Sequence, residues 1–399
     1  MTALELSFQF PIKRDGASPV AAAGSIVAGA ADSVASSVAS SVASGAADSV
    51  TAGSEAGASS ESLPEFEITI AASSTTATRT AKSVLPDEPW RGAALGLGAA
   101  AFTAGFAAAG GSIEKSTTRA FAALELLQAC ALIHDDLMDG SDTRRGKPSI
   151  HRHFETMHVQ DQLDGFAPQY GLSAAVLLGD LALVWSDQML NSAGLSNEHY
   201  ARMIPLYNEM RVELMAGQFL DIHEQTQKNT NTARSMKIAR YKSGKYTIER
   251  PLHLGAALSS TYSKEILAAL SAYGLPLGEA FQLRDDLLGV FGDPSVTGKP
   301  AGDDLREGKR TVLIAMTHER QSAAQAETCK KYFGRPDLDA DGVAILQEII
   351  ESTGARAELE STIETLTVAA LTAAESSLFT NDGKALLVEL ANIATKRSA

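Results

Sequence analysis

The chain has 399 residues, of which 45% are hydrophobic, and a formal net charge of −14. An acidic chain without a long basic block is not expected to bind nucleic acid. Its two cysteines, Cys130 and Cys329, have no companions at the spacing of metal ligands, so we expect a reduced, cytoplasmic protein.

A low-complexity region comes first, at residues 17–62, where SVAS recurs three times between Ser33 and Ser44. Such a stretch has few large apolar groups to offset the entropy lost on ordering. We therefore predict a disordered tail over residues 1–62 and one folded all-α domain over residues 63–399. The opening MTALELSFQFPIKRDG lacks the charged and apolar regions of a signal peptide, so secretion is not expected.

Long Ala/Leu-rich segments with helical periodicity follow, separated by short breaks of Gly, Pro and Asn, and this pattern predicts an all-α fold. The first of them, AALGLGAAAFTAGFAAA, is weakly hydrophobic and short for a membrane span, so a buried helix is expected and no span. We expect helices at residues 93–109, 116–140, 172–192, 198–228, 234–259, 263–291 and 309–320, with several more from residue 340 onward.

The first acidic cluster is IHDDLMDGSDTRRG, residues 133–146, with four aspartates in eight positions. On a helix Asp135 and Asp139 share a face and Asp136 flanks it, so their repulsion predicts a bound cation. Aspartate oxygens with no nearby Cys favour a hard ion, Mg²⁺ rather than zinc. A solvated acidic face capped by arginine remains the alternative.

A second acidic cluster, QLRDDLLGVFGD from Gln282 to Asp293, lies about 150 residues later near the end of another predicted helix. Carboxylates that bind Mg²⁺, interleaved with Lys and Arg, suit a diphosphate, because metal ions bridge the anions and basic side chains satisfy the remaining oxygens. The neighbouring basic residues are Arg240, Lys242, Lys245, Lys299 and Lys309.

DDLMD followed by TRRGKPSIH, then GQFLD, YKSGKYT and FQLRDDLLGVFGD, resemble the trans-isoprenyl diphosphate synthase family, the polyprenyl synthetases, over residues 90–320. The resemblance implies an antiparallel helical bundle of the isoprenoid synthase type with a central cavity, in a homodimer. It also implies Mg²⁺ as cofactor, with isopentenyl diphosphate and an allylic diphosphate as substrates.

By position, the resemblance assigns the metal to Asp135, Asp136 and Asp139 on one side and to Asp285 and Asp286 on the other. The allylic diphosphate would contact Arg144, Lys242, Lys299 and Lys309, whereas Arg145 would face isopentenyl diphosphate. Gln218 and Gln282 would lie near the ionising carbon or the metal waters, and Ser243 stands where the family usually has Thr. The residues expected to carry the chemistry are Asp135, Asp139, Lys242, Gln282 and Asp285.

Product length depends, by the same resemblance, on the residues four and five positions before Asp135, where aromatic side chains stop growth near fifteen carbons. This chain has Cys130 and Ala131 there. Both are small, so a C15 tail should pass, with Leu127 and Leu124 as the first bulky side chains below. We predict a C20 product, geranylgeranyl diphosphate, unless these two residues only pack against another helix.

The sequence departs from the family upstream, where a Gly-Gly-Lys-Arg-Leu-Arg-Pro-like segment normally binds isopentenyl diphosphate. Here LPDEPWRGAALGL aligns Arg91 with the last Arg and places Glu88 at the Lys, and Gln128 stands where many members have His. An acidic residue beside a diphosphate is unfavourable. A non-catalytic subunit that modulates a partner synthase therefore remains an alternative, as does a terpene cyclase, although the second motif lacks the metal triad of cyclases.

Overall fold

The computed structural model describes the backbone of Glu5–Gln9 and Glu65–Thr69 and, beyond these strands, residues 97–111, 115–144, 147–227, 230–293 and 301–396. The chain divides into two compact units. The smaller one, Ala3–Ala71, contains the antiparallel pair β1 (Glu5–Gln9) and β2 (Glu65–Thr69). β1 lies inside the expected tail, whereas the repeats at residues 17–62 and the domain boundary at residue 63 lie outside the described residues and stay predictions.

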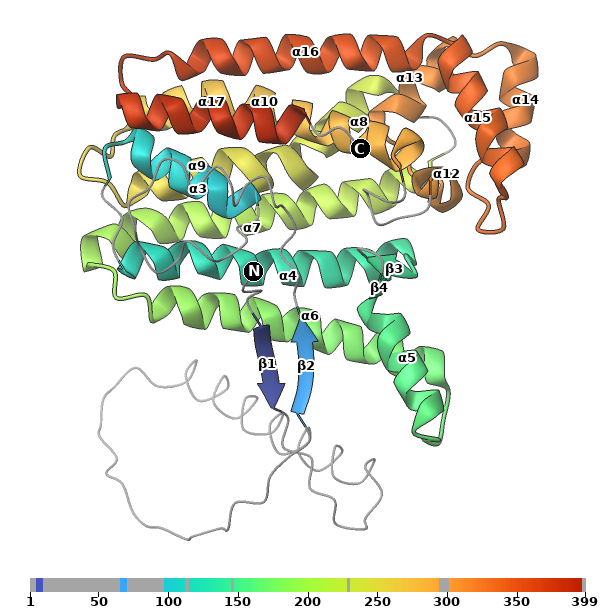
Figure 1. Cartoon of the computed structure of the whole chain (residues 1–399), viewed down its shortest axis with the longest axis horizontal. Coiled ribbons are helices and arrows are strands. Elements are labelled where there is room, and N and C mark those ends of the chain that lie inside the picture. The colour runs from blue at the N-terminus through green and yellow to red at the C-terminus, as the bar shows by residue number, and fades with distance from the viewer. Residues whose placement is uncertain are drawn as a thin grey trace, which may run out of the picture. The chain divides into compact units, whose positions relative to one another are not determined.

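The larger unit is helical throughout its described residues apart from one short strand pair, which confirms the predicted all-α class. The pair is β3 (Thr143–Arg144) with β4 (Lys147–Pro148). The helical elements, all but η1 labelled in Figure 1, are α3 (Leu97–Ala108), α4 (Lys115–Asp139), α5 (Ile150–Gln160), α6 (Ala167–Asn191), α7 (Asn197–Gln225), α8 (Thr232–Ile238), the π-helix η1 (Ala239–Glu249), α9 (Arg250–Ala257), α10 (Lys264–Phe291), α12 (Asp303–Glu307), α13 (Val312–Arg320), α14 (Ala323–Tyr332), α15 (Ala340–Ser352), α16 (Ala355–Ala374) and α17 (Asn381–Thr395).

Most of the long helices begin and end close to the predicted residues, and four differences stand out. α5, α12 and α14 were not expected, and the helix predicted from residue 309 starts instead at Val312. Thr311 ends the preceding loop, because its side chain accepts a hydrogen bond from the Ile314 N–H and caps α13. Lys309 therefore lies on a loop between α12 and α13.

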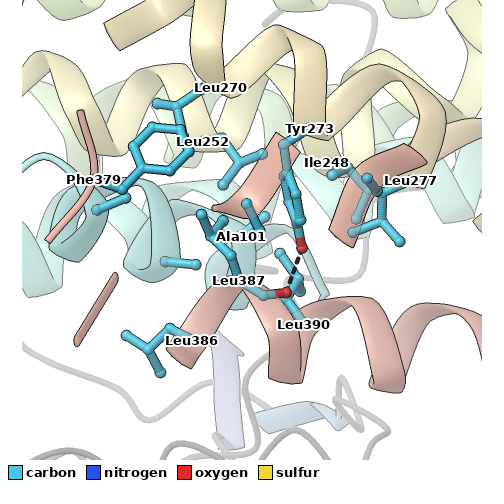
Figure 2. Packing of buried hydrophobic residues seen from close by; sticks show 14 of the residues in the cluster. Ala101, Ile248, Leu252, Leu270, Tyr273, Leu277, Phe379, Leu386, Leu387 and Leu390 are labelled. Atoms are coloured by element: carbon cyan, nitrogen blue, oxygen red, sulfur yellow. Dashed lines mark hydrogen bonds between the residues drawn. The ribbon is translucent and has the colours of Figure 1, made fainter. Parts of the chain in front are cut away.

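One cluster of the hydrophobic core is built where α9, α10 and α17 meet. Figure 2 shows Leu252, Tyr273 and Leu387 packed together, with the Tyr273 hydroxyl donating to the Leu387 carbonyl at 2.6 Å. Burial of this aromatic side chain is favourable because its one polar atom is paired.

α3 is the Ala/Gly-rich segment expected to be buried, and it is. A Cβ atom on Gly105 would lie 2.1 Å from the Leu252 carbonyl oxygen, and one on Gly255 would lie 2.0 Å from the Phe102 carbonyl oxygen. Glycine at both positions lets α3 and α9 touch backbone to backbone. By length and composition alone two described helices, α6 and α10, are apolar enough to cross a membrane, a test that core helices also pass.

The segments that carry the predicted site lie in layers. α4 packs on α6, α7 packs on η1, and η1 packs in turn on α10, which is covered by α16 (Figure 1). The first aspartate motif thus ends α4, YKSGKYT lies in η1, and the second motif lies in the last two turns of α10.

Candidate active site

Asp135, in the last turn of α4, is held by two groups from other elements. The Gln218 side-chain amide on α7 donates to Asp135 Oδ1 at 3.0 Å, and Lys242 Nζ in η1 lies 3.0 Å from the same oxygen. Burial alone would raise the pKa of this carboxyl, but Lys242, Lys309 and Arg144 outweigh burial and hold the pKa well below its usual range. Asp135 is therefore an anion that three cations surround.

Asp136 is engaged by one cation from the strand that follows. The Arg144 Nε atom donates to Asp136 Oδ1 at 2.8 Å and to Oδ2 at 3.1 Å, and its terminal nitrogen donates to Oδ1 as well. The Asp136 side chain is 5% exposed, so this pair is nearly dry. The same guanidinium also lies 3.5 Å from Asp135 Oδ2. Asp136 thus fixes Arg144 at the mouth of the motif.

Asp139 closes α4 against the loop after α12. Lys309 Nζ lies 2.9 Å from Asp139 Oδ2, 2.8 Å from Glu307 Oε2 and 3.7 Å from Asp304 Oδ1. Burial raises the pKa of the Asp139 carboxyl, and the charge of Asp135 adds to the increase. Both Asp139 oxygens are buried and, apart from the Lys309 ion pair, accept no hydrogen bond. This carboxylate therefore carries unused ligand capacity.

The second motif contains two aspartates with different surroundings. Asp286 is buried; Gln282 donates to its Oδ1 at 2.8 Å and the Val312 N–H donates to its Oδ2 at 3.2 Å. Burial raises the pKa of Asp286 to about 8, with Asp304 and Asp285 adding to it. Asp285 is exposed, and the described part of the chain offers it no hydrogen bond or ion pair. Its charge nevertheless helps to raise the pKa of Arg144, the residue that pairs with Asp136 of the first motif.

Lys242 connects the first motif to α7. Its Nζ donates to Asp221 Oδ2 at 2.6 Å while it contacts Asp135. Burial disfavours the charge, but Asp135, Asp221 and Asp139 raise the pKa of Lys242 above its usual value. The side chain is thus a fixed cation close to both Asp135 and Asp139.

Two observations test whether these residues suit a metal ion. Within the described ranges, no three His, Cys, Asp or Glu side chains gather around one point. Yet Asp139 has a buried Oδ1 that accepts no hydrogen bond, and Asp285 is exposed. Hard oxygen donors of this kind match Mg²⁺, which also retains several waters and needs few protein ligands. The residues fit a hard divalent cation.

The remaining predicted residues fall into two groups. Gln128 accepts a hydrogen bond from the Tyr246 hydroxyl at 2.9 Å, and Ser243 is half-buried in η1 beside Lys242. Cys130 is buried in α4, and Ala131 packs partly buried against a cluster from α4, α6 and α7. Three predicted substrate-binding residues lie outside the described residues: Arg91, Arg145 and Lys299.

Residues that the sequence did not single out complete the site. Asp304 and Glu307 share Lys309 with Asp139, and Ser141 donates to Glu307, which ties α12 to the end of α4. Gly289 on α10 leaves room for the Asp304 carboxylate, since a Cβ there would lie 2.0 Å from Asp304 Oδ2 unless that side chain moved. Asp304 lies in GDDLREGKRT, five residues before Lys309. An acidic residue this close to a predicted substrate-binding Lys is the signal that could have identified it.

Comparison with known proteins agrees with this geometry. The polyprenyl synthetase family model matches residues 90–350, so the chain belongs to that family. It is 32% identical over 257 residues to a geranylgeranyl diphosphate synthase of Mycobacterium tuberculosis, which covers 64% of this chain and 67% of that protein. It is 35% identical over 196 residues to a geranylfarnesyl diphosphate synthase of Aeropyrum pernix, covering 48% of this chain and 56% of that protein.

A solved structure is also similar. A geranylgeranyl pyrophosphate synthase of Corynebacterium glutamicum, complexed with isoprenyl diphosphate and magnesium, is 42% identical with a TM-score of 0.73. The match covers 75% of this chain and 86% of that one. The match thus spans between about half and two thirds of the length of these two curated relatives. It spans most of the length of the solved structure.

Proposed function

We propose that the protein is a Mg²⁺-dependent trans-prenyltransferase that condenses isopentenyl diphosphate with an allylic diphosphate. The observation that supports this most is the arrangement around Asp135 and Asp139, where Lys242, Lys309 and Arg144 lie beside the two aspartates and the buried Asp139 Oδ1 accepts no hydrogen bond. Alternating anions and cations suit a ligand that brings both phosphate oxygens and metal ions. A solvated acidic face would not bury Asp139.

The reaction breaks the allylic C–O bond, with diphosphate leaving as an anion. Bound Mg²⁺ supplies Lewis acidity to that leaving group. Lys242, Lys309 and Arg144 are fixed cations, so they stabilise the developing charge without reorganising during the step. The π-bond of isopentenyl diphosphate then attacks the carbocation to form the new C–C bond. A proton is lost from the adduct, and the departing diphosphate is the base in this proposal.

Protein groups set the positions of these cations. Asp221 and Asp135 hold the Lys242 ammonium between α7 and α4, and Asp136 holds Arg144 in a fixed plane. Gln218 and Gln282 each donate to a motif aspartate, Asp135 and Asp286 respectively. The two glutamines therefore orient the carboxylates.

The product we propose is geranylgeranyl diphosphate, C20. Ala131 lies one helical turn, about 5.4 Å, before Asp135, and Cys130 is its neighbour. A buried layer lies below them. It contains Leu127, Leu124 and side chains of α7. A small residue pair above a bulky layer leaves room for a C15 tail to enter and gain one unit.

The active form we propose is a cytoplasmic homodimer. On α7, the side chains of Val212, Met215 and Phe219 are 67%, 56% and 67% exposed at a spacing that puts them on one helical face. On α6, Leu177 and Val184 repeat this pattern. A second copy that covers these faces would bury apolar surface that water otherwise contacts, and would account for the apolar α6 without a membrane. Sedimentation of the purified chain tests this.

Incubation with isopentenyl diphosphate, an allylic diphosphate and Mg²⁺ tests the proposed activity against its alternatives. A longer prenyl diphosphate supports the synthase. A hydrocarbon would indicate a terpene cyclase, and absence of any product would favour a subunit that modulates a partner synthase. The intact aspartates and their cations favour the first outcome.

A further inference from the structure

The π-helix η1, which carries Lys242, is confined by close backbone contacts on two sides. A Cβ on Gly217 of α7 would lie 2.3 Å from the Lys242 nitrogen and 2.6 Å from its Cα. On the other side, a Cβ on Gly278 of α10 would lie 2.4 Å from the Gly244 carbonyl oxygen. Because the obstructing atoms are backbone, no side-chain movement could relieve either clash. These contacts fix how near η1 lies to α7 and α10, but not its rotation.

One carboxylate contacts both sides of the junction where η1 becomes α9. Glu213, one turn before Gly217 on α7, accepts from Arg250 Nε at 2.7 Å through Oε2 and from the terminal nitrogen at 2.9 Å through Oε1. Lys245 also donates to Glu213 Oε1. Lys245 belongs to η1, whereas Arg250 is the first residue of α9. All three side chains are largely buried, between 10% and 14% exposed.

The π geometry is what brings Lys245 and Arg250 to the same carboxylate. The Arg250 N–H donates to the Lys245 carbonyl, the i→i+5 hydrogen bond that defines a π-helix. Residues joined in this way lie above one another on one face. In an α-helix, with 3.6 residues per turn, residues five apart would lie about 140° apart around the axis. Glu213 could then contact one of the two cations, but not both.

Glu213 is charged in this setting. Burial alone would raise the pKa of its carboxyl, but the hydrogen bonds and charges of Arg250 and Lys245 outweigh burial and lower the pKa. Its partners therefore interact with a full negative charge at neutral pH. Charge-assisted and bidentate hydrogen bonds are the strong ones in proteins, so this contact can select between two helical registers.

We propose that Glu213 is a positioning residue that holds η1 in its π-helical register and thereby places Lys242 beside Asp135. The proposal rests on the proposed function in one respect, that Lys242 contacts the allylic diphosphate. Without Glu213, the segment before Arg250 is free to tighten to an α-helix, which rotates the residues before it, Lys242 included, relative to α9. Glu213 would then act on the reaction without touching substrate.

Kinetics of Glu213→Ala and Glu213→Gln test this role. We expect kcat/KM for the allylic diphosphate to fall on the order of 10²-fold in Glu213→Ala, the size of effect that an error of about 1 Å in position can cause. Glu213→Gln keeps a hydrogen bond and should lose less. KM for isopentenyl diphosphate should change much less than KM for the allylic substrate. Equal changes for both substrates would overturn the proposal and indicate general loosening of the fold.

A double-mutant cycle with Lys242→Ala separates positioning from independent stabilisation. Since Glu213 acts through Lys242, adding Glu213→Ala to Lys242→Ala should reduce kcat/KM little further. Effects that multiply would overturn the proposal. Glu209→Gln is the matched control: Glu209 contacts Arg250 at 2.7 Å but has no contact with Lys245, so kcat/KM should stay close to wild type.

A crystal structure of Glu213→Ala tests the register without any assay of activity. We expect i→i+4 hydrogen bonds over residues 242–249 and a Lys242 Nζ that has left Asp135. An unchanged π-helix in this variant would overturn the proposal even if the enzyme were active. If the wild-type chain made no prenyl product, the proposed function would be wrong. The crystal structure of Glu213→Ala would still decide whether Glu213 holds the π-helical register.

Discussion

The two aspartate motifs look alike in the sequence, yet the structure surrounds them differently. Asp135, Asp136 and Asp139 at the end of α4 all lie against protein cations. In α10, Asp286 accepts from a side-chain amide and a backbone N–H, whereas Asp285 is exposed. The first motif is therefore already partly charge-balanced, and the second pairs an anchoring carboxyl with a carboxylate that is available to a ligand.

The difference implies that adjacent aspartates need not share a role. Asp136 and Asp286 are the buried members of their pairs, and each holds protein groups in place, Arg144 in one case and the start of α13 in the other. Asp135 and Asp285 are the members that we propose to face the ligand. The two aspartates within each adjacent pair therefore differ in role, as do the two motifs.

The largest expected effect comes from removing the facing carboxylates. Asp135→Ala or Asp285→Ala should lower turnover by several orders of magnitude with the fold retained, since loss of one preorganised electrostatic contact commonly costs about 10²–10³-fold. Steady-state kinetics and circular dichroism check this. Near-normal turnover in either variant would remove that residue from the ligand site.

The second prediction separates Asp286 from Asp285 by stability. Asp286→Ala leaves the buried Val312 N–H and the Gln282 amide without their acceptor, so the free energy of unfolding should fall by about 1–3 kcal/mol. Asp285→Ala is the matched control on the same helix and should unfold close to wild type because that side chain is exposed. Denaturant titration measures both, and equal losses would contradict the assigned difference.

The third prediction concerns the α4 side only. Ala131→Phe places an aromatic ring one turn before Asp135, and we expect the main product to shorten from C20 to C15. Mass analysis of the products checks this. Leu132→Phe is the control, because the next residue lies about 100° further around α4 and should leave the product length unchanged. An unchanged length with normal activity in Ala131→Phe would show that Ala131 only packs against its neighbours.

The smallest expected effect tests the second substrate, which neither motif is expected to bind directly. If Glu88 lies near isopentenyl diphosphate, Glu88→Lys should lower KM for that substrate several-fold. A change of this size corresponds to the small free energy that one exposed charge contact contributes. KM for the allylic diphosphate should hardly change. The same shift for both substrates, or none, would place Glu88 away from the site.

Much of the fold was predictable because helical periodicity is a local property. α5 was missed because two of its three buried positions are His151 and His158, which a hydrophobic pattern counts as polar. α14 was missed because it buries little, although Ser322 and Gln325 form a capping box that could have marked its start. The π-helix η1 could not be predicted because its closeness to α7 and α10 depends on Gly217 and Gly278, and its proposed register depends on Glu213, all on other helices.

The candidate site was predictable as a set of residues but not as a set of pairs. Charge spacing indicated Asp135 and Asp139, and the family resemblance indicated Lys242. No local pattern shows that Lys242 bridges Asp135 and Asp221, or that Asp304 shares Lys309 with Asp139, because each pair joins different helices. Such contacts follow only from the three-dimensional packing of α7, η1 and α12.

We assign both aspartate motifs to the same diphosphate, and a double mutant tests this assignment. We would measure kcat/KM for the allylic diphosphate in wild type, Asp135→Ala, Asp285→Ala and the double variant. Because both carboxylates are assigned to the same leaving group, the account predicts a double variant only slightly less active than either single variant. Losses that multiply fully would contradict it, since they would mean that the two motifs act independently.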